Sequence, residues 1–460
     1  MSDEMVTDNE RDDDAYVLDP GTVSAVLDAV EQGQAAVLTE LMTPLHAADI
    51  ADLLEQIGEA ERRDLVLLYD REFDGEILSE LDEGLREEII AVLHPQVLAD
   101  AVRELESDDV VDLLEDLDVP QQEVILEALE DADRVAVEQA LSYPEFSAGR
   151  LMQREIVIAP EHWNVGEAID FMRASEDLPD QFYHLMLVNP RLEPFGYVAL
   201  GRLMATKRVV KLVDITEKEF RTFEVGEDEA DVAYAFNQYH LISAPVVDAD
   251  GRLVGVITID DAMNILDEEH EEDILRLAGV GESSMSDKVG DTIKRRFPWL
   301  AVNLVTAILA SLVIAQFEET IARFVALAVL LPIVASMGGN AGTQSLTVAV
   351  RAIATRDLTS SNVWRVIRRE VMVGLVNGVI FAFVMGVVGM LWFDSPVLGG
   401  VIAVAMVINL LVAGLAGIMI PVTLDRYGID PALASGAFVT TVTDVVGFLA
   451  FLGLAAVVLL

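Results

Sequence analysis

The stretch Ser395–Leu424 reads SPVLGGVIAVAMVINLLVAGLAGIMIPVTL and contains no charged side chain over 30 residues. A bilayer core of about 30 Å takes roughly 20 helical residues to cross, so this run is long enough to span a membrane. Four other runs share this character, namely Phe297–Phe317, Phe324–Val350, Val371–Phe393 and Pro431–Leu460. Only Asp444 interrupts the last one. We therefore predict an all-α bundle of five transmembrane helices over residues 297–460.

The charge of the chain is divided as unevenly as its hydropathy. The 460 residues carry 30 basic and 79 acidic side chains, a formal net charge of −49, although 52% of them are hydrophobic. Residues 291–460 hold 10 basic and 9 acidic groups, so a net charge of −50 lies in residues 1–290. This division excludes a single-domain enzyme and a collagen-like or disordered chain. Nucleic acid is not expected as a partner, because an acidic protein repels a polyanion.

Residue usage also indicates the environment of the protein. Cysteine is absent, which excludes disulfides and thiolate metal sites. Only 5 of the 30 basic residues are Lys, and an acidic surface poor in Lys suits molar salt, where screening is nearly complete. We predict a halophilic source, with a merely acidic protein as the alternative. Residues 1–20 lack the basic and apolar regions of a signal peptide, and we predict a disordered acidic tail there.

Basic residues between the apolar runs predict the orientation of the bundle. Residues 294–296 are all basic, five Arg lie between residues 351 and 369, and Arg426 follows the fourth run. The links after the first and third runs contribute the acids at 318–319 and Asp394. The basic side is the side of the N-terminal half. We therefore expect a multi-pass protein of the cell membrane with cytoplasmic N-terminal domains.

Polar residues inside the apolar runs indicate function. A carboxylate such as Asp444 costs about 2.5–3.5 kcal/mol at mid-bilayer. No Lys or Arg lies at comparable depth, so an ion site or pore is favoured over a structural salt bridge. The second run contains MGGNAGTQS at residues 337–345, whose small residues allow close packing and whose oxygens suit a cation. We expect Asn303, Asn377 and Asn409 to bond between helices.

Residues 21–148 are predicted to form a helical N domain with a 24-residue repeat. Apolar positions recur at this offset, for example Leu53 and Ile77. Each unit is about one helix pair, and stacked pairs form an α-superhelix. His46 and His94 lie 48 residues apart, and a structural role is favoured over metal ligation for both.

The following part of the chain changes to an α/β pattern with a second repeat. Leu187–Val198 aligns without gaps on Val246–Ile257 at an offset of 59 residues. The second copy, Ala244–Asp261, resembles a CBS domain. We therefore predict a CBS pair, with the first domain at 149–209 and the second at 210–266, which resembles a regulatory ligand sensor.

The second CBS copy also matches a nucleotide-binding pattern. In CBS pairs that bind adenosine nucleotides, a Thr and an Asp three residues later hold the ribose. Thr258 and Asp261 match this pattern, whereas the first copy has Ala199 and Arg202. The resemblance thus implies at most one site of this kind, for which ATP is the candidate ligand.

The segment between the CBS pair and the first apolar run is strongly acidic. We predict a connecting helix at 267–296, and its first residues, DEEHEED at 267–273, contain six carboxylates. Like charges four residues apart destabilise a helix by a few tenths of a kcal/mol. A divalent cation would remove this repulsion, and a solvated acidic face is the alternative.

The order of these modules resembles the MgtE family of magnesium channels. The resemblance covers nearly the whole chain from about residue 20 and rests on four motifs, Tyr143–Met152, Gly338–Gln344, Asp430–Ser435 and Thr440–Gly447. It implies a homodimer in the lipid bilayer that admits Mg²⁺ down its electrochemical gradient. It also implies closure when cytosolic Mg²⁺ binds the N domain, the CBS pair and the connecting helix.

The resemblance further implies which residues bind Mg²⁺. Asp444 matches the pore Asp, supported by oxygens near Thr440 and Asn340. Asp430 matches the acid at the inner mouth, and Glu318 matches the acid that closes the first span on the outer side. The sensor carboxylates are expected among Asp260, Asp261, Glu271, Glu272 and Asp273.

Two other functions remain open from the residues alone. A CBS-regulated transporter could carry another solute, such as Co²⁺, an anion or an ion-coupled substrate, although an anion path should contain basic residues in the spans. A membrane-tethered nucleotide sensor would leave Asp444 unexplained. No enzyme activity is expected, because the chain has no Ser/His/Asp set and no phosphate-binding loop with a Gly-Lys-Ser/Thr ending.

Overall fold

The computed structural model describes residues 18–115, 117, 119–175, 178–179, 181–280 and 289–460. The predicted acidic tail lies outside the described residues except for its last three positions. The chain divides into two compact units, Met1–Glu269 and His270–Leu460, and we describe each unit separately.

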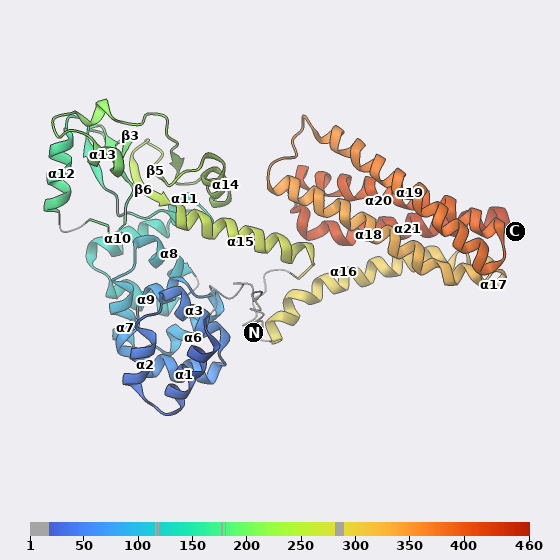
Figure 1. The fold of residues 1–460 in the computed structure, drawn as a ribbon, viewed down its shortest axis with the longest axis horizontal. Coiled ribbons are helices and arrows are strands. Elements are labelled where there is room, and N and C mark those ends of the chain that lie inside the picture. Colours follow the sequence, from blue (N-terminus) through green and yellow to red (C-terminus); the bar gives the residue numbers. More distant parts are fainter. Residues whose placement is uncertain (1–17, 116, 118, 176–177, 180, 281–288) are drawn as a thin grey trace, which may run out of the picture. The chain divides into compact units, whose positions relative to one another are not determined.

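The first part of the first unit is a stack of short helices (Figure 1). The helices are α1 (Pro20–Glu31), α2 (Ala35–Met42), α3 (Ala47–Gln56), α4 (Glu59–Tyr69), α5 (Glu76–Ser79), α6 (Glu83–Val92), α7 (Pro95–Val102), α8 (Ser107–Glu115), α9 (Val119–Ala128) and α10 (Asp131–Ala140), with the 3₁₀ turn η1 (Asp70–Glu72). The recurring apolar positions Leu53 and Ile77 are 1% and 0% exposed and belong to one core. The predicted repeat therefore places its apolar positions in the core.

The two histidines of the repeat cap helices. His46 precedes α3 and accepts a hydrogen bond through Nδ1 from the Ala48 amide (3.3 Å). His94 precedes α7 and accepts one in the same way from Gln96 (3.3 Å). Satisfying an unpaired amide at a helix N-terminus is a structural task. The predicted structural role of these histidines is confirmed.

The second part of the first unit contains two three-stranded sheets. The first has the order β1 (Ile158–Pro160), β2 (His184–Val188), β3 (Pro194–Ala199), and the second has β4 (Phe223–Glu224), β5 (Ser243–Val247), β6 (Leu253–Thr258). In each sheet the first two strands are parallel and the last two antiparallel. The helices are α11 (Ala148–Leu151), α12 (Val165–Ala174), α13 (Leu200–Ala205), η2 (Leu212–Asp214), α14 (Glu229–Tyr239) and α15 (Ile259–Leu277).

The two sheets repeat each other residue by residue. Leu187 pairs with Gly196 in the first sheet, and Val246 pairs with Gly255 in the second, at the predicted offset of 59. A β-bulge follows the same position in both sheets. The predicted CBS pair is confirmed, and this α/β module together with the helical N domain gives the expected fold class.

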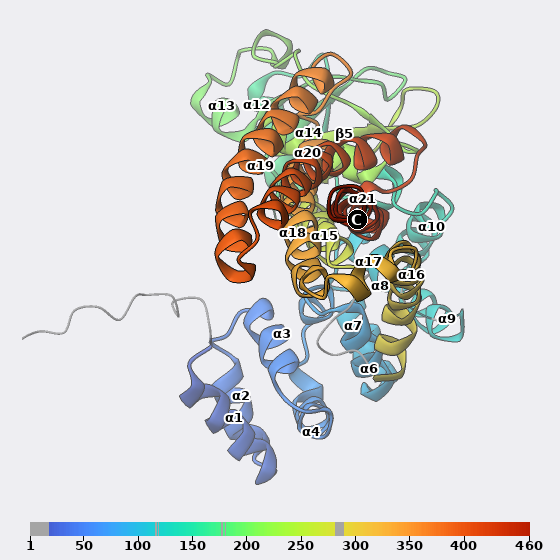
Figure 2. The same ribbon diagram turned by 90° about the vertical axis from the view of Figure 1, so that its right-hand side faces the viewer.

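The second unit contains five helices long and apolar enough to cross a membrane, counted over the described part of the chain. They are α16 (Val289–Ala315), α18 (Ala326–Ala354), α19 (Val363–Phe393), α20 (Pro396–Arg426) and α21 (Pro431–Leu459), with the short α17 (Glu318–Arg323) after the first. Figure 2 looks along this bundle, in which α20 packs against α18, α19 and α21. Of the most apolar segment of α20, 61% is buried inside the single chain, compared with 28% for α18.

Two details differ from the sequence prediction. The link between the first two runs was expected to carry acids and no Lys or Arg, but it contains Arg323 on α17, so the side expected to lie outside is less acidic than the acids at 318–319 alone indicate. One Arg does not reverse a bias set by nine basic residues on the other side. Of the three Asn expected between helices, Asn303 and Asn377 are exposed in the single chain, and only Asn409 joins two helices.

Candidate functional site

The carboxylate of Asp444 lies on α21 among three threonines. Asp444 is half-buried, and no described residue forms an ion pair with it. Thr440 donates its hydroxyl to the carbonyls of Gly436 (2.9 Å) and Ala437 (3.1 Å), and Thr441 and Thr443 likewise donate to carbonyls of α21. Thr443 is fully buried, whereas Thr440 and Thr441 are partly exposed. The oxygen lone pairs of the latter two hydroxyls remain available, so this part of α21 can offer acceptors to a cation.

The glycine motif of α18 has two different faces. Gly338 and Gly342 are buried, and Gly342 faces Val439 and Thr443 of α21. The polar residues Asn340, Thr343 and Gln344 are exposed in the single chain. The glycines thus provide close helix packing, as small residues do in membranes, and the polar side chains lie on a separate, uncovered face.

Asn340 and Asp444 make no hydrogen bond or ion pair with each other in the described structure. Asn340 donates through Nδ2 to Ser336 of its own helix (3.3 Å). Its predicted support of Asp444 stays a prediction.

Asn409 fixes the crossing of three helices. This side chain of α20 is fully buried, and its Nδ2 donates to the carbonyl of Val334 on α18 (2.7 Å). The amide group lies against the bare backbone of Gly338 on one side and Gly447 of α21 on the other. Its Oδ1 is buried and has no hydrogen-bond partner among the described residues. The bond to Val334 confirms the interhelical role predicted for this residue.

The three predicted pore acids lie at different heights in the helix bundle. Asp430 is the N-cap of α21, where its Oδ1 accepts from the Ala432 amide (2.7 Å). Asp444 follows 14 residues later, about 21 Å along a helix that rises 1.5 Å per residue. Glu318 starts α17 at the opposite end of the bundle and is exposed. These acids could form successive positions on one path, not a single site.

Of the predicted sensor acids, Asp260 and Asp261 lie in a cluster with acids of α8 in the first unit. Thr258 donates to Asp261 (2.5 Å), and Asp261 shares a hydrogen bond with the buried Asp108. Asp109 is the neighbouring acid on α8. Further members are Glu106, which accepts from Gln153, and Glu155, which accepts from Ser107 (2.8 Å) and from the Arg154 amide (2.9 Å).

Burial and mutual repulsion make this cluster hard to ionise. Burial, together with the charges of Glu155 and Asp261, raises the pKa of Glu106 to about 7. Burial, Asp261 and Glu106 raise the pKa of Asp109 to about 7. Burial raises the pKa of Asp261 to about 6, and burial and Asp261 raise the pKa of Asp108 well above its usual value. A proton or a cation would relieve the repulsion that these groups share.

The other three predicted sensor acids lie in the second unit, on the last part of α15. Glu271 is exposed, and Glu272 forms an ion pair with Arg276 (2.5 Å). Burial and the charge of Asp430 raise the pKa of Asp273. The five acids therefore divide between two units. In the described residues, no three His, Asp or Glu side chains already enclose a metal position.

The nucleotide-pattern residues are adjacent. The 2.5 Å hydrogen bond joins Thr258 at the end of β6 to Asp261 in the first turn of α15. In the first copy, Ala199 ends β3 and Arg202 lies on α13. The second copy alone keeps a hydroxyl and a carboxylate in this geometry.

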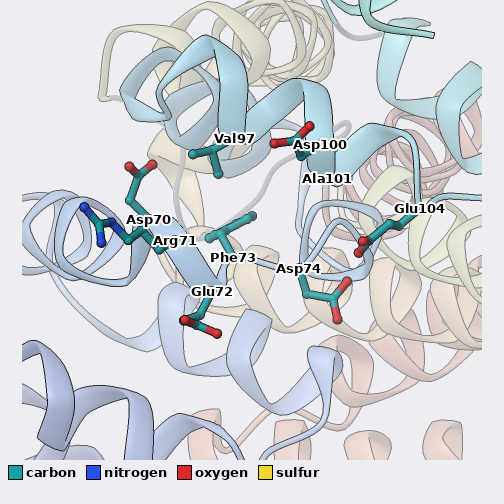
Figure 3. A pocket seen from close by; sticks show the side chains of 9 residues that line it. All are labelled: Asp70, Arg71, Glu72, Phe73, Asp74, Val97, Asp100, Ala101 and Glu104. Carbon is teal, nitrogen blue, oxygen red and sulfur yellow. The ribbon is translucent and has the colours of Figure 1, made fainter. Parts of the chain in front are cut away.

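A cavity of about 280 Å³ lies elsewhere, in the helical N domain (Figure 3). Its lining consists of Asp70, Arg71, Glu72, Phe73, Asp74, Val97, Asp100, Ala101 and Glu104. None of these is a predicted site residue, and we assign no function to this cavity.

Two groups of site residues were missed by the sequence analysis. The first is the set of α8 acids around Asp108, which begin a helix but look like the many solvated acids of the chain. The second is Glu370 on α19, which is 7% exposed and accepts a hydrogen bond from Ser345 of α18 (3.0 Å). Its position directly before an apolar run of 23 residues was the only available signal.

A helical domain, a CBS pair and five membrane-length helices define a multi-pass membrane protein with a soluble N-terminal region. Family models agree with this division: a divalent cation transporter model matches residues 331–454, an MgtE intracellular N domain matches 45–146, and a CBS domain matches 212–268.

Proteins of similar sequence indicate which family of membrane proteins this chain belongs to. The magnesium transporter MgtE of Thermus thermophilus is 30% identical over 439 residues, covering 94% of this chain and 97% of that protein. That of Enterococcus faecalis is 32% identical over 320 residues, covering 70% and 71%. A solved cytosolic domain of the Mg²⁺ channel MgtE in complex with ATP is 27% identical, covers 53% of this chain and 99% of its own, and has a TM-score of 0.49. The chain belongs to the MgtE family of divalent cation transporters.

Proposed function

We propose that this chain forms a channel that conducts Mg²⁺ into the cell, with Asp444 as its central ion site. The observation that carries the proposal is a membrane-depth carboxylate that has no described counter-charge. Such a group is costly in lipid, and the cost is offset where it faces water and a cation. The curated relatives are named magnesium transporters, which fits a divalent cation.

The channel is proposed to be a homodimer. The exposed face of α18 carries Asn340, Thr343 and Gln344, and a polar face of this kind would be unfavourable against lipid. A second copy would cover it and bring a second Asp444 to the same path. This arrangement explains why α18 is much less buried in one chain than α20.

The chemistry of the path suits a largely hydrated Mg²⁺. Mg²⁺ prefers oxygen ligands and loses its water reluctantly. One carboxylate and the acceptor oxygens of Thr440 from each protomer could hold the ion through its water shell. A negative-inside potential supplies about 2.3 kcal/mol per charge per 100 mV, roughly 4.6 kcal/mol for a divalent ion. No chemical energy source is then required.

Ion uptake into proteoliposomes tests the proposal. We expect wild-type protein to carry Mg²⁺ under a negative-inside potential and Asp444→Ala to lose this flux. Asp394→Asn, which removes a carboxylate at the outer end of α19, is the matched control and should retain it. Equal flux through Asp444→Ala and the wild type would contradict the assignment. Competition by Co²⁺ in the same assay distinguishes a magnesium path from a broader divalent cation path.

We further propose that cytosolic Mg²⁺ closes the channel by binding the carboxylates of the soluble region. The supporting observation is the buried cluster around Asp108 and Asp261, in which burial and the charge of Asp261 raise the pKa of Asp108, and burial and the charge of Asp260 raise the pKa of Asp261. Mg²⁺ would replace protons on these oxygens and hold the N domain and the second CBS domain together. Asp260, Glu271, Glu272 and Asp273 are proposed as further members of the sensor.

Closure can be tested with an acid of the cluster and an exposed acid. In the variant Asp109→Asn, a higher Mg²⁺ concentration on the cytoplasmic side should be needed to stop Mg²⁺ flux through the channel. Asp100→Asn changes an acid of α7 that is paired with the exposed Arg103 and should leave closure unchanged. Identical closure curves for both variants and the wild type would refute this sensor.

ATP is proposed as a ligand of the second CBS domain, held through its ribose by Thr258 and Asp261. The supporting observation is their 2.5 Å hydrogen bond. Calorimetric titration of the full chain with ATP should show binding that Thr258→Val removes. Ala199→Ser, at the matching position of the first copy, should leave it intact. Binding that survives Thr258→Val would exclude this site.

A further inference from the structure

The last turn of α15 contacts the inner end of the pore helix α21 within the second unit. Leu277 packs on a small apolar cluster that includes Leu346 of α18 and Ala432 and Val439 of α21. The carbonyl of Leu277 faces Gly436, where a Cβ atom would lie 3.9 Å away. The segment that follows the acidic stretch is therefore seated beside the N-terminus of α21.

Arg276, the neighbouring residue, joins this segment to the proposed inner-mouth acid. Its Nη1 lies 3.3 Å from Oδ2 of Asp430, and its Nη2 lies 2.5 Å from Oε2 of Glu272. The side chains of Arg276 and Asp430 are 28% and 30% exposed. The N–H donors of a guanidinium lie in its plane and point outward along different edges, so one Arg can bind two carboxylates at once.

The position of Glu272 keeps this guanidinium in place. Glu272 precedes Arg276 by four residues on the same helix, the favourable order for such a pair. Asp430 has both oxygens engaged, because Oδ1 accepts the Ala432 amide while Oδ2 faces Arg276. Without Arg276, the acids Glu272, Asp273 and Asp430 would leave a strongly negative inner mouth.

We propose that Arg276 is a tethered cation that occupies the inner-mouth carboxylate Asp430 and competes with the permeating divalent ion for it. The inference deepens the proposed channel function and rests on it. Mg²⁺ and the guanidinium require the same oxygen of Asp430. Release of the last turn of α15 would remove both the apolar contact of Leu277 and the positive charge. Arg276 thus determines whether Asp430 at the inner mouth is free to bind the permeating ion.

Flux measurements test this role in the full chain. Arg276→Gln should raise the Mg²⁺ flux that remains at closing Mg²⁺ concentrations about two- to fivefold, the range expected for a partly exposed ion pair. The residual Mg²⁺ flux of Arg276→Lys should lie between those of the wild type and Arg276→Gln, because the Lys ammonium keeps the positive charge but lacks the planar, two-pronged donor geometry of the guanidinium. Arg426→Gln removes the same charge at the cytoplasmic end of α20 and should match the wild type. An unchanged residual flux in Arg276→Gln would overturn the proposal.

A second measurement does not depend on transport. The chain has no cysteine, so Leu277→Cys introduces a single thiol, partly buried in its contact with α21. Its rate of labelling by a maleimide should rise about two- to fivefold when Arg276→Gln is added. Ile274→Cys, which is 67% exposed on the same helix, should label fast in both backgrounds.

The two measurements separate the inference from the channel function. A labelling difference with no Asp444-dependent flux in any variant would refute the proposed channel and still support the Arg276 contact. Equal labelling of Leu277→Cys with and without Arg276 would refute the contact itself. Asp444-dependent flux in the wild type, combined with that result, would leave the channel function standing.

Discussion

The exchange of Gly338 for Ala is predicted to disrupt the crossing of α18, α20 and α21. A Cβ atom at this position would lie 2.8 Å from Oδ1 and 2.9 Å from Cγ of Asn409. The Asn409 amide is fully buried and also lies against Gly447, so it has no free space into which to move. The methyl group must therefore separate the helices or displace the amide from its hydrogen bond.

The structure gives the size of this effect. Overpacking of a filled core costs about 1–3 kcal/mol. Loss of the 2.7 Å bond from Asn409 to Val334 adds about 0.6–1.7 kcal/mol in a membrane bundle. We expect a total loss of about 2–4 kcal/mol. Gly339→Ala is the matched control, since nothing lies within 4 Å of its Cβ position, and the better helix propensity of Ala should make it neutral or stabilising by up to about 1 kcal/mol.

The assay is unfolding of the purified full chain in a titration with sodium dodecyl sulfate, followed by tryptophan fluorescence. Three of the four Trp residues, Trp299, Trp364 and Trp392, lie on α16 and α19, so the signal reports mainly on the membrane unit. The double variant Gly338→Ala with Asn409→Ala should lose at least about 1 kcal/mol less than the sum of the single changes, because they share one contact. Equal effects of Gly338→Ala and Gly339→Ala would refute the reasoning.

Three further predictions follow from groups described above. Glu370→Gln keeps an acceptor for Ser345 and should lower the free energy of unfolding by less than about 1 kcal/mol in the same titration. Glu370→Ala leaves a cavity and an unpaired hydroxyl and should lower it by about 2–4 kcal/mol. Equal losses in the two variants would contradict this prediction. Glu106 and Asp109 have pKa values raised to about 7 from the ordinary 4.5 and 3.8. Their contribution to stability is therefore full below about pH 4 and disappears as the pH rises through about 7. Thermal unfolding of the soluble unit should occur at a higher temperature at pH 5.5 than at pH 8, and Asp109→Asn should reduce this difference in unfolding temperature. The net charge of −50 on residues 1–290 predicts that molar KCl raises the unfolding temperature of this unit by screening its repulsion, and a temperature independent of salt would argue against a halophilic surface.

The membrane helices and the CBS pair could be predicted because their signals are local and repeated. A charge-free run as long as Ser395–Leu424 has few alternatives to a membrane helix, and the offset of 59 residues reappears as equal strand register. The helices extend beyond the apolar runs from which they were predicted. Helix α16 begins at Val289, before the basic residues 294–296, because a helix continues beyond the lipid core where charged side chains reach water.

The partners of the site residues could not be predicted because they depend on which face each residue presents. Asn303, Asn377 and Asn409 are equivalent as letters in apolar runs, yet only Asn409 points into a helix crossing. The acids of α8 have the same composition as solvated acids, and their burial against the second CBS domain arises from packing between distant segments. Arg276 gave no signal in sequence, because its partner Asp430 lies 154 residues away.

The orientation of the threonine hydroxyls beside Asp444 bears on whether protons could follow the same path as the ion. A chain of groups relays protons only if each member can donate a hydrogen as well as accept one. The partly exposed Thr440 and Thr441 donate their hydrogens to carbonyls of their own helix, so they would offer only lone pairs to a hydrated ion. A path lined in this way supplies no proton wire of its own. Any proton movement along such a path would therefore depend on its water, and a pH dye enclosed in the vesicles would measure that movement during uptake.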